Sequence, residues 1–123
     1  MFSVTIRQHI MIAHSLPHPD FGPAQRVHGA TYVTDVTFFS EQLTEMGIVI
    51  DIALAHDALK QALAPLNYQN LDALPQFEGK LTTTEFLAQY IHGKVKEAVA
   101  SQFEGRIKVV LGESHEAWAA YEA

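Results

Sequence analysis

The chain has 123 residues, of which 48% are hydrophobic and 18% charged, a composition typical of one soluble globular domain with a real core. The net charge of −6 argues against a nucleic-acid or anionic-membrane partner, and the absence of cysteine excludes disulfides, thiolate metal sites and a cysteine nucleophile. No apolar run reaches transmembrane length and the N-terminus lacks a signal-peptide core, so we expect a single cytoplasmic domain over residues 1–123.

The first part of the chain predicts two long strands. Apolar residues alternate with polar or smaller ones over residues 2–12, and His14 continues the same face. A turn-rich stretch with the sequence SLPHPDFGP follows. Residues 27–39 are rich in Thr, Val, Tyr and Phe, which favours a second strand.

The second part predicts two helices and a return to strand. From Asp51 to about residue 66 apolar residues recur at helical spacing. The segment from Thr82 to Glu85 matches the capping-box pattern, so a second helix is expected from there to near Gly105. Residues 107–113 alternate again, and the tail HEAWAAYE fits either a helix or a last strand.

This order of elements predicts an α+β fold. Strands that pair in sequence and helices that are segregated from them favour a four-stranded antiparallel sheet with two helices on one face. Such a sheet has two exposed edges, and edges of this kind are often closed by oligomerisation into a larger barrel. We therefore expect a homo-oligomer.

Six segments extend along nearly the whole chain: IAHSLPH, RVHGATY, GIVIDI, LNYQNLD, TTTEF and VVLGES. In this order and spacing they resemble the 6-pyruvoyl-tetrahydropterin synthase family, which includes the bacterial 6-carboxy-tetrahydropterin synthases of queuosine biosynthesis. The resemblance implies a T-fold whose subunits form trimeric rings that stack into hexamers, with a barrel of strands. It also implies a pterin-type small-molecule substrate bound at subunit interfaces.

The resemblance assigns the ring-binding glutamate to Glu113. A carboxylate can accept two hydrogen bonds from the amino-pyrimidine edge of a pterin; without the resemblance, a solvated glutamate at a strand end explains the residue equally well. Thr83, Thr84 and Glu85 match a family segment near the ring, and helix capping is their alternative or additional role. Asp51 matches a position that is structural, at the entrance to the first helix.

The family holds a zinc ion with three histidines, one after the first strand and two in an HGH motif. His14 and His28 match two of them, but Ala30 stands at the third position and a methyl group cannot ligate a metal. The sequence thus allows a residual zinc site or two hydrogen-bonded histidines without metal. Three side chains have the chemistry of a substitute ligand: His18, Asp20 and His115.

The residues that carry the family's acid–base chemistry are also changed. Ala24 stands where the family often has a cysteine, and methyl cannot act as base or nucleophile. Asn67 and Tyr68 stand at the family's Asp-His pair, in which a carboxylate orients an imidazole. An amide beside a phenol with a pKa near 10 cannot reproduce that pair at neutral pH.

Three interpretations follow. The chain is a divergent pterin enzyme, with the family's lyase chemistry weakened or changed and with His115 as a candidate acid, base or ligand. Alternatively, it is a non-catalytic protein that keeps the ring pocket, or a structural oligomer in which the pocket has no role. The metal content of the purified protein and the effect of Glu113→Ala on pterin binding distinguish them.

Overall fold

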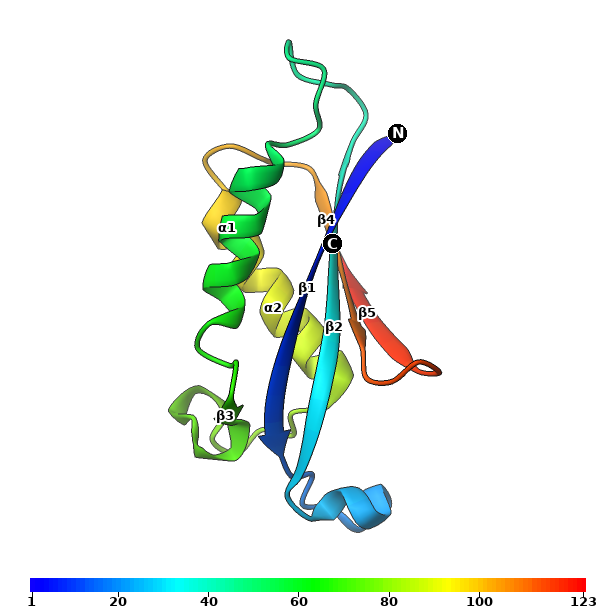
Figure 1. Cartoon of the computed structure of the whole chain (residues 1–123), viewed down its shortest axis with the longest axis vertical. Coiled ribbons are helices and arrows are strands. Elements are labelled where there is room, and N and C mark those ends of the chain that lie inside the picture. The colour runs from blue at the N-terminus through cyan, green and yellow to red at the C-terminus, as the bar shows by residue number, and fades with distance from the viewer.

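The computed structural model describes all 123 residues and contains a sheet that is covered on one face by two α-helices (Figure 1). The elements in chain order are β1 (Phe2–His14), β2 (His28–Ser40), α1 (Ile52–Leu63), β3 (Gln69–Asn70), α2 (Thr84–Val99), β4 (Arg106–Gly112) and β5 (Trp118–Glu122). Short 3-10 helices occupy Pro19–Gln25, Leu71–Ala73 and Pro75–Phe77. Neither α-helix has the length and hydropathy needed to cross a membrane.

The sheet has five strands in the order β3-β1-β2-β4-β5. The four long strands are antiparallel, as the sequence predicts, but β3 pairs with β1 in parallel and makes the sheet mixed. The prediction of a four-stranded sheet is therefore wrong by one strand. With only two residues, β3 has no alternation that a sequence could display. The side-chain oxygen of Asn67 and the backbone N–H of Tyr68 both bond to the backbone of Met11, which brings this segment to β1.

The tail forms strand β5, although its alanines favour helix. It pairs with β4 from Lys108 opposite Glu122 to Gly112 opposite Trp118. Arg106 and Glu122 form an ion pair at 3.0 Å across the same two strands. Pairing with a neighbouring strand and cover by α2 outweigh the local preference of the alanines.

The core lies between the sheet and the helices. Alternate residues of β2 and β4 are buried there, among them Val36, Phe38 and Val109, each 0% exposed. The opposite face of the sheet is polar, where Arg7 donates two hydrogen bonds to the carboxylate of Asp35. The alternation predicted from the sequence thus separates a helix-covered face from an open one.

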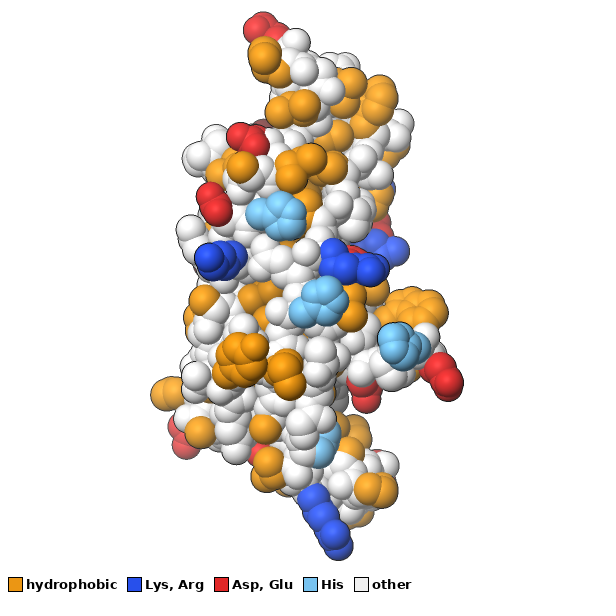
Figure 2. Space-filling view, in the orientation of Figure 1, with side chains coloured by type: hydrophobic (Ala, Val, Ile, Leu, Met, Phe, Trp, Pro, Cys, Tyr) orange, Lys and Arg blue, Asp and Glu red, His pale blue; other side chains and the backbone are white.

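The loop between β2 and α1 projects from one end of the molecule. Figure 2 shows hydrophobic side chains gathered over this end, and three exposed apolar residues belong to the loop: Leu43, Met46 and Ile48. Because a small protein rarely exposes several large apolar side chains together, this loop is a candidate contact surface.

Both α-helices begin at a side-chain cap. The carboxylate of Asp51 accepts a hydrogen bond from the N–H of Ala53 at 2.9 Å, in agreement with its predicted structural role. The hydroxyl of Thr83 accepts from the N–H of Phe86 at 3.1 Å. The cap is therefore one residue later than the capping box predicted from Thr82, whose hydroxyl is bonded to a histidine instead.

The turn from α2 into β4 depends on a glycine. A Cβ atom at Gly105 would collide with the backbone oxygen of Phe39 and with the ring of Phe103. In contrast, a Cβ atom at Gly93, within α2, would meet no atom within 4 Å. The same substitution should therefore have opposite effects at the two positions.

We predict that Gly105→Ala lowers the free energy of unfolding by about 1–3 kcal/mol because the added methyl overpacks the turn. Gly93→Ala should raise it by about 0.5–1 kcal/mol because alanine loses less backbone entropy in a helix. Urea unfolding of the two variants beside the wild type measures both changes. Two changes of the same sign would contradict the packing of this turn.

Candidate functional site

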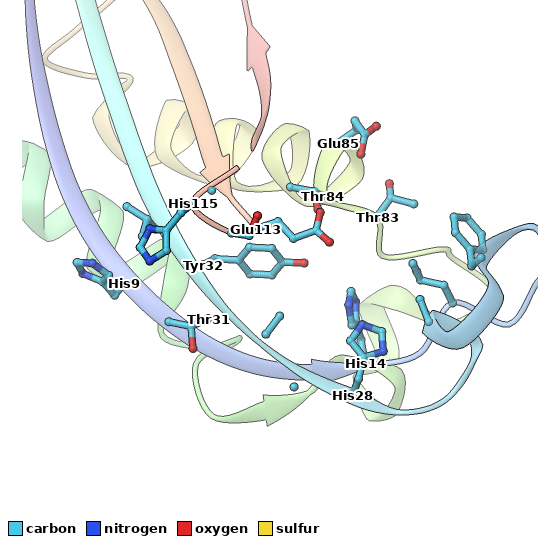
Figure 3. A pocket seen from close by; sticks show the side chains of 18 residues that line it. His9, His14, His28, Thr31, Tyr32, Thr83, Thr84, Glu85, Glu113 and His115 are labelled. Carbon is cyan, nitrogen blue, oxygen red and sulfur yellow. The ribbon is translucent and has the colours of Figure 1, made fainter. Parts of the chain in front are cut away.

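An open cavity of about 890 Å³ lies where β2 extends beyond the end of β4 (Figure 3). β4 pairs with β2 only from Val33 onward, so residues 28–32 have no strand on that side. The cavity walls come from the end of β1, the start of β2, the first turn of α2 and the turn between β4 and β5. The 3-10 helix Pro19–Gln25 contributes Phe21 and Ala24.

The free edge of β2 directs backbone groups toward this cavity. The N–H and C=O of Met11 bond outward, to Asn67 and Tyr68. In an antiparallel pair, the residue opposite an outward-facing one also faces outward. Thr31 stands opposite Met11. Gly29 is two residues before Thr31 on β2, so its backbone groups point in the same direction. The backbone donors and acceptors of Thr31 and Gly29 therefore face the open side of β2, along the cavity.

The predicted ring-binding residues meet on one wall. Glu113 directly follows β4, and its Oε2 accepts a hydrogen bond from the hydroxyl of Thr84 at 3.1 Å. The backbone N–H of Glu113 donates to the oxygen of Ala117 at 3.0 Å, which fixes the turn that presents the carboxylate. Thr83 and Glu85 line the same cavity. The structure thus brings all four predicted residues together.

The N-terminus of α2 is the positive feature of this wall. An α-helix carries a partial charge of about +0.5 at its N-terminus, and α2 has 16 residues. Its first residue, Thr84, holds the carboxylate of Glu113, and Glu85 lies in its first turn. The helix end therefore lies next to two carboxylates, one of which it also holds by a hydrogen bond.

The two predicted zinc ligands form a pair. His14 and His28 are cross-strand partners at the ends of β1 and β2, and their ring centroids are 4.6 Å apart. Nδ1 of His28 lies 2.8 Å from the carbonyl oxygen of Arg26. Because a carbonyl can only accept, this Nδ1 carries the proton in the neutral ring and Nε2 keeps its lone pair.

His14 is buried and neutral. It is 4% exposed, and its Nδ1 lies 3.0 Å from the hydroxyl of Thr82. Burial lowers the pKa of His14 below its ordinary value, and the neighbouring His28 lowers it further. At neutral pH the imidazole of His14 is therefore uncharged.

The residues present do not fit a catalytic zinc of the three-histidine type. Ala30 lines the cavity at the third position, and no group of three or more His, Cys, Asp or Glu side chains is placed to hold a metal ion. Of the substitute ligands, His18 accepts a hydrogen bond from the N–H of Asp20 as a local cap. His18 and Asp20 do not line the cavity, whereas the third substitute ligand, His115, does.

The residues at the family's catalytic positions separate into two places. Ala24 lines the cavity. Asn67 and Tyr68 lie at the other edge of β1, and neither lines the cavity of its own chain. Tyr68 is 77% exposed and has a φ of 60°, a conformation uncommon for a bulky residue.

Several cavity residues were not predicted, among them Tyr32, His9 and Phe21. Tyr32 lies on the same face of β2 as His28 and Ala30, so continuing the period of two would have identified it. His9 belongs to the open face of the sheet and Phe21 to the irregular turn. Neither position has a sequence pattern that indicates the cavity.

Tyr32 is 1% exposed and lies beside Glu113 (Figure 3). Burial raises the pKa of its phenol above the ordinary value. The hydroxyl of Thr84 partly offsets this rise, whereas the charges of Glu113 and Glu85 add to it. The phenol is therefore neutral over the physiological range.

We predict that Tyr32 makes the fold sensitive to alkali. Its folded pKa exceeds its unfolded value, so its contribution to stability is complete below about pH 10 and is lost as pH rises through the folded pKa. Tyr32→Phe should flatten the fall in unfolding free energy above about pH 10, measured by urea unfolding. Tyr68→Phe, at an exposed ring, is the control, and equal slopes in both variants would contradict the prediction.

Comparison with known proteins identifies relatives of this chain. The family model described as 6-pyruvoyl tetrahydropterin synthase matches residues 3–123. The 6-carboxy-5,6,7,8-tetrahydropterin synthase of Bacillus subtilis is 29% identical over 99 residues, which cover 77% of this chain and 66% of that protein. The match thus spans just under two thirds of this curated relative.

Solved structures show the same fold. The 6-pyruvoyl tetrahydropterin synthase of Caenorhabditis elegans aligns with a TM-score of 0.83 and 25% identity, over 100% of this chain and 97% of that one. The Plasmodium falciparum 6-pyruvoyl tetrahydropterin synthase aligns with a TM-score of 0.80 and 17% identity, over 99% and 97% of the two chains. At the latter identity the likeness concerns the fold alone.

Proposed function

Because this chain belongs to the 6-pyruvoyl tetrahydropterin synthase family, we propose that its cavity binds a pterin-type ring while the lyase chemistry of the family is weakened or changed. The observation that carries the proposal is the carboxylate of Glu113, which Thr84 holds at a cavity wall beside the buried ring of Tyr32. A fixed acceptor on the wall of an open cavity suits a heterocycle with N–H donors.

Glu113 has acceptor capacity to spare. A carboxylate offers about four lone-pair sites, and the hydroxyl of Thr84 uses one of them. Both oxygens can therefore accept from the amino-pyrimidine edge of a ring. Thr83 and Glu85 lie along the same wall, and the free backbone edge at Gly29 offers further neutral donors and acceptors.

The weakened chemistry follows from the side chains at three positions of the family's mechanism. The methyl groups of Ala24 and Ala30 cannot transfer a proton or ligate a metal. Asn67 offers an amide oxygen, and that oxygen already accepts from the N–H of Met11 at 3.0 Å. With these groups the cavity keeps the means to bind a ring but not the means for the standard reaction.

Two forms of the proposal differ in what happens after binding. In the enzymatic form, His115 at the cavity rim serves as an acid or base for a different reaction, which remains of the lyase type. In the non-catalytic form, the chain binds the ring and does not transform it. The local hydrogen bonds of His18 and Asn67 favour the second form, because they engage groups that could otherwise have replaced the missing chemistry.

We also propose that the chain assembles into trimeric rings that stack into hexamers. Most of the outer edge of β1 and the whole outer edge of β5 have no partner strand within the chain, and unpaired edges favour pairing between subunits. Trp118 on β5 is 66% exposed and Met46 in the projecting loop is 84% exposed, as contacts between subunits would require.

We predict that Glu113→Gln weakens binding of dihydroneopterin by about 10- to 100-fold, because a hydrogen bond to a charged group contributes about 1.5–3 kcal/mol. Quenching of intrinsic fluorescence during titration measures the affinity. Glu116→Gln is the matched control, since it makes the same change in the same turn outside the cavity. Equal affinities of the wild type and Glu113→Gln would refute the assigned role.

We predict that the wild type, purified without added zinc, carries far less than one zinc ion per chain. Ala30→His supplies a third imidazole on the strand of His28 and should raise zinc affinity by orders of magnitude. Elemental analysis after dialysis measures both. Ala30→Gln adds bulk without an imidazole and serves as control. Stoichiometric zinc in the wild type would mean that another group completes the site.

A further inference from the structure

We infer that Tyr32 is a specificity-determining residue of the cavity, because its phenol can donate a hydrogen bond to a carbonyl oxygen on the ring of the ligand. This role rests on the proposed function and deepens it. It states which kind of ring the cavity prefers, namely one that carries a carbonyl group next to its amino and N–H donors.

Strand β2 fixes Tyr32 in the cavity wall. The residue stands opposite Ile10 of β1, on the face of β2 that also carries His28 and Ala30. Only 1% of Tyr32 is exposed, yet it lines the cavity. Because its ring is buried, a ligand cannot stack on the aromatic face. A hydrogen bond needs only the phenol oxygen, so this atom is the part of Tyr32 that can contact a ligand.

The phenol proton remains available to a ligand. The hydroxyl of Thr84 is close enough to affect the pKa of Tyr32, but Thr84 donates its own proton to Glu113 at 3.1 Å. Thr84 can therefore only accept from the phenol, and an acceptor on a bound ring competes with it. By contrast, the hydroxyl of Thr34, two residues further along the same face of β2, is sealed in the core without a partner.

The cavity wall thus presents a donor next to an acceptor. A phenol is protonated at neutral pH, and burial together with the charges of Glu113 and Glu85 raises the pKa of Tyr32 further. The carboxylate of Glu113, which can only accept, lies beside the phenol (Figure 3). Residues that a neighbouring subunit adds at the open side of the cavity leave this pair in place.

The edge of an amino-pyrimidinone ring carries the matching groups. Its amino group and its ring N–H are two donors, which the two oxygens of Glu113 can accept. The carbonyl oxygen next to the N–H is an acceptor that projects beyond the ring, whereas the ring nitrogen on the other side of the amino group is set back. A donor beside Glu113 therefore suits the carbonyl oxygen. A ring without that oxygen would leave the buried phenol without a partner, which disfavours its binding.

The test compares pterin with 4-thiopterin, each titrated into the native oligomer by isothermal titration calorimetry. In 4-thiopterin a sulfur atom, which is a weak acceptor, replaces the carbonyl oxygen, while the amino group and the ring N–H remain. We expect Tyr32→Phe to weaken pterin binding by about 3- to 10-fold and to change the affinity for 4-thiopterin by less than about twofold.

Tyr90→Phe is the matched control. It also removes one phenol oxygen, from a residue of α2 that does not line the cavity, so it should bind both compounds as the wild type does. Phenylalanine at position 32 keeps the buried ring, and urea unfolding at neutral pH verifies that both variants fold.

The possible results separate the role of Tyr32 from ring binding itself. If Tyr32→Phe binds pterin as tightly as the wild type does, the inferred role is refuted, while ring binding through Glu113 stands. If the variant loses affinity for both compounds equally, the phenol supports the wall and does not recognise the carbonyl, which also overturns the inference. If the wild type binds neither compound, the proposed function fails, and the role of Tyr32 fails with it.

Discussion

The pairing of β1 with β2 is the interaction on which the rest of the structure depends. The two strands run antiparallel over all 13 residues of each, whereas β4 covers only part of β2. The difference in length leaves a free strand edge, and the cavity lies along it. The same register places His14 opposite His28 at the end of the ribbon. The register of this one ladder thus determines where the cavity lies and which residues meet at its base.

Much of this arrangement could be predicted from the sequence, because the long elements have strong periods. The alternation along β1 and β2 and the helical spacing after Asp51 correspond to observed elements. The convergence of Glu113, Thr84 and the histidine pair came from the family resemblance, and the structure brings these residues to one cavity. Tyr32 was missed although the alternation that identifies His28 and Ala30 also includes it.

The remaining features depend on contacts between distant segments and so have no local pattern. Strand β3 exists because Asn67 and Tyr68 bond to Met11, more than fifty residues earlier in the chain. The cap of α2 begins at Thr83 rather than Thr82 because Thr82 bonds to His14. In both cases a polar side chain has two possible uses, and only the assembled fold determines which one it makes.

Ala24 and Ala30 lie at positions that affect the chemistry of the cavity more than the stability of the fold. Both residues lie on the cavity wall and outside the cluster of 24 buried residues that forms the core, although Ala30 packs against the edge of that cluster. An exchange at either position alters what the cavity can do to a ligand and removes no side chain from the buried cluster. Selection for folding therefore does not preserve these positions, and a lineage can lose a reaction while its protein continues to fold, assemble and accumulate normally.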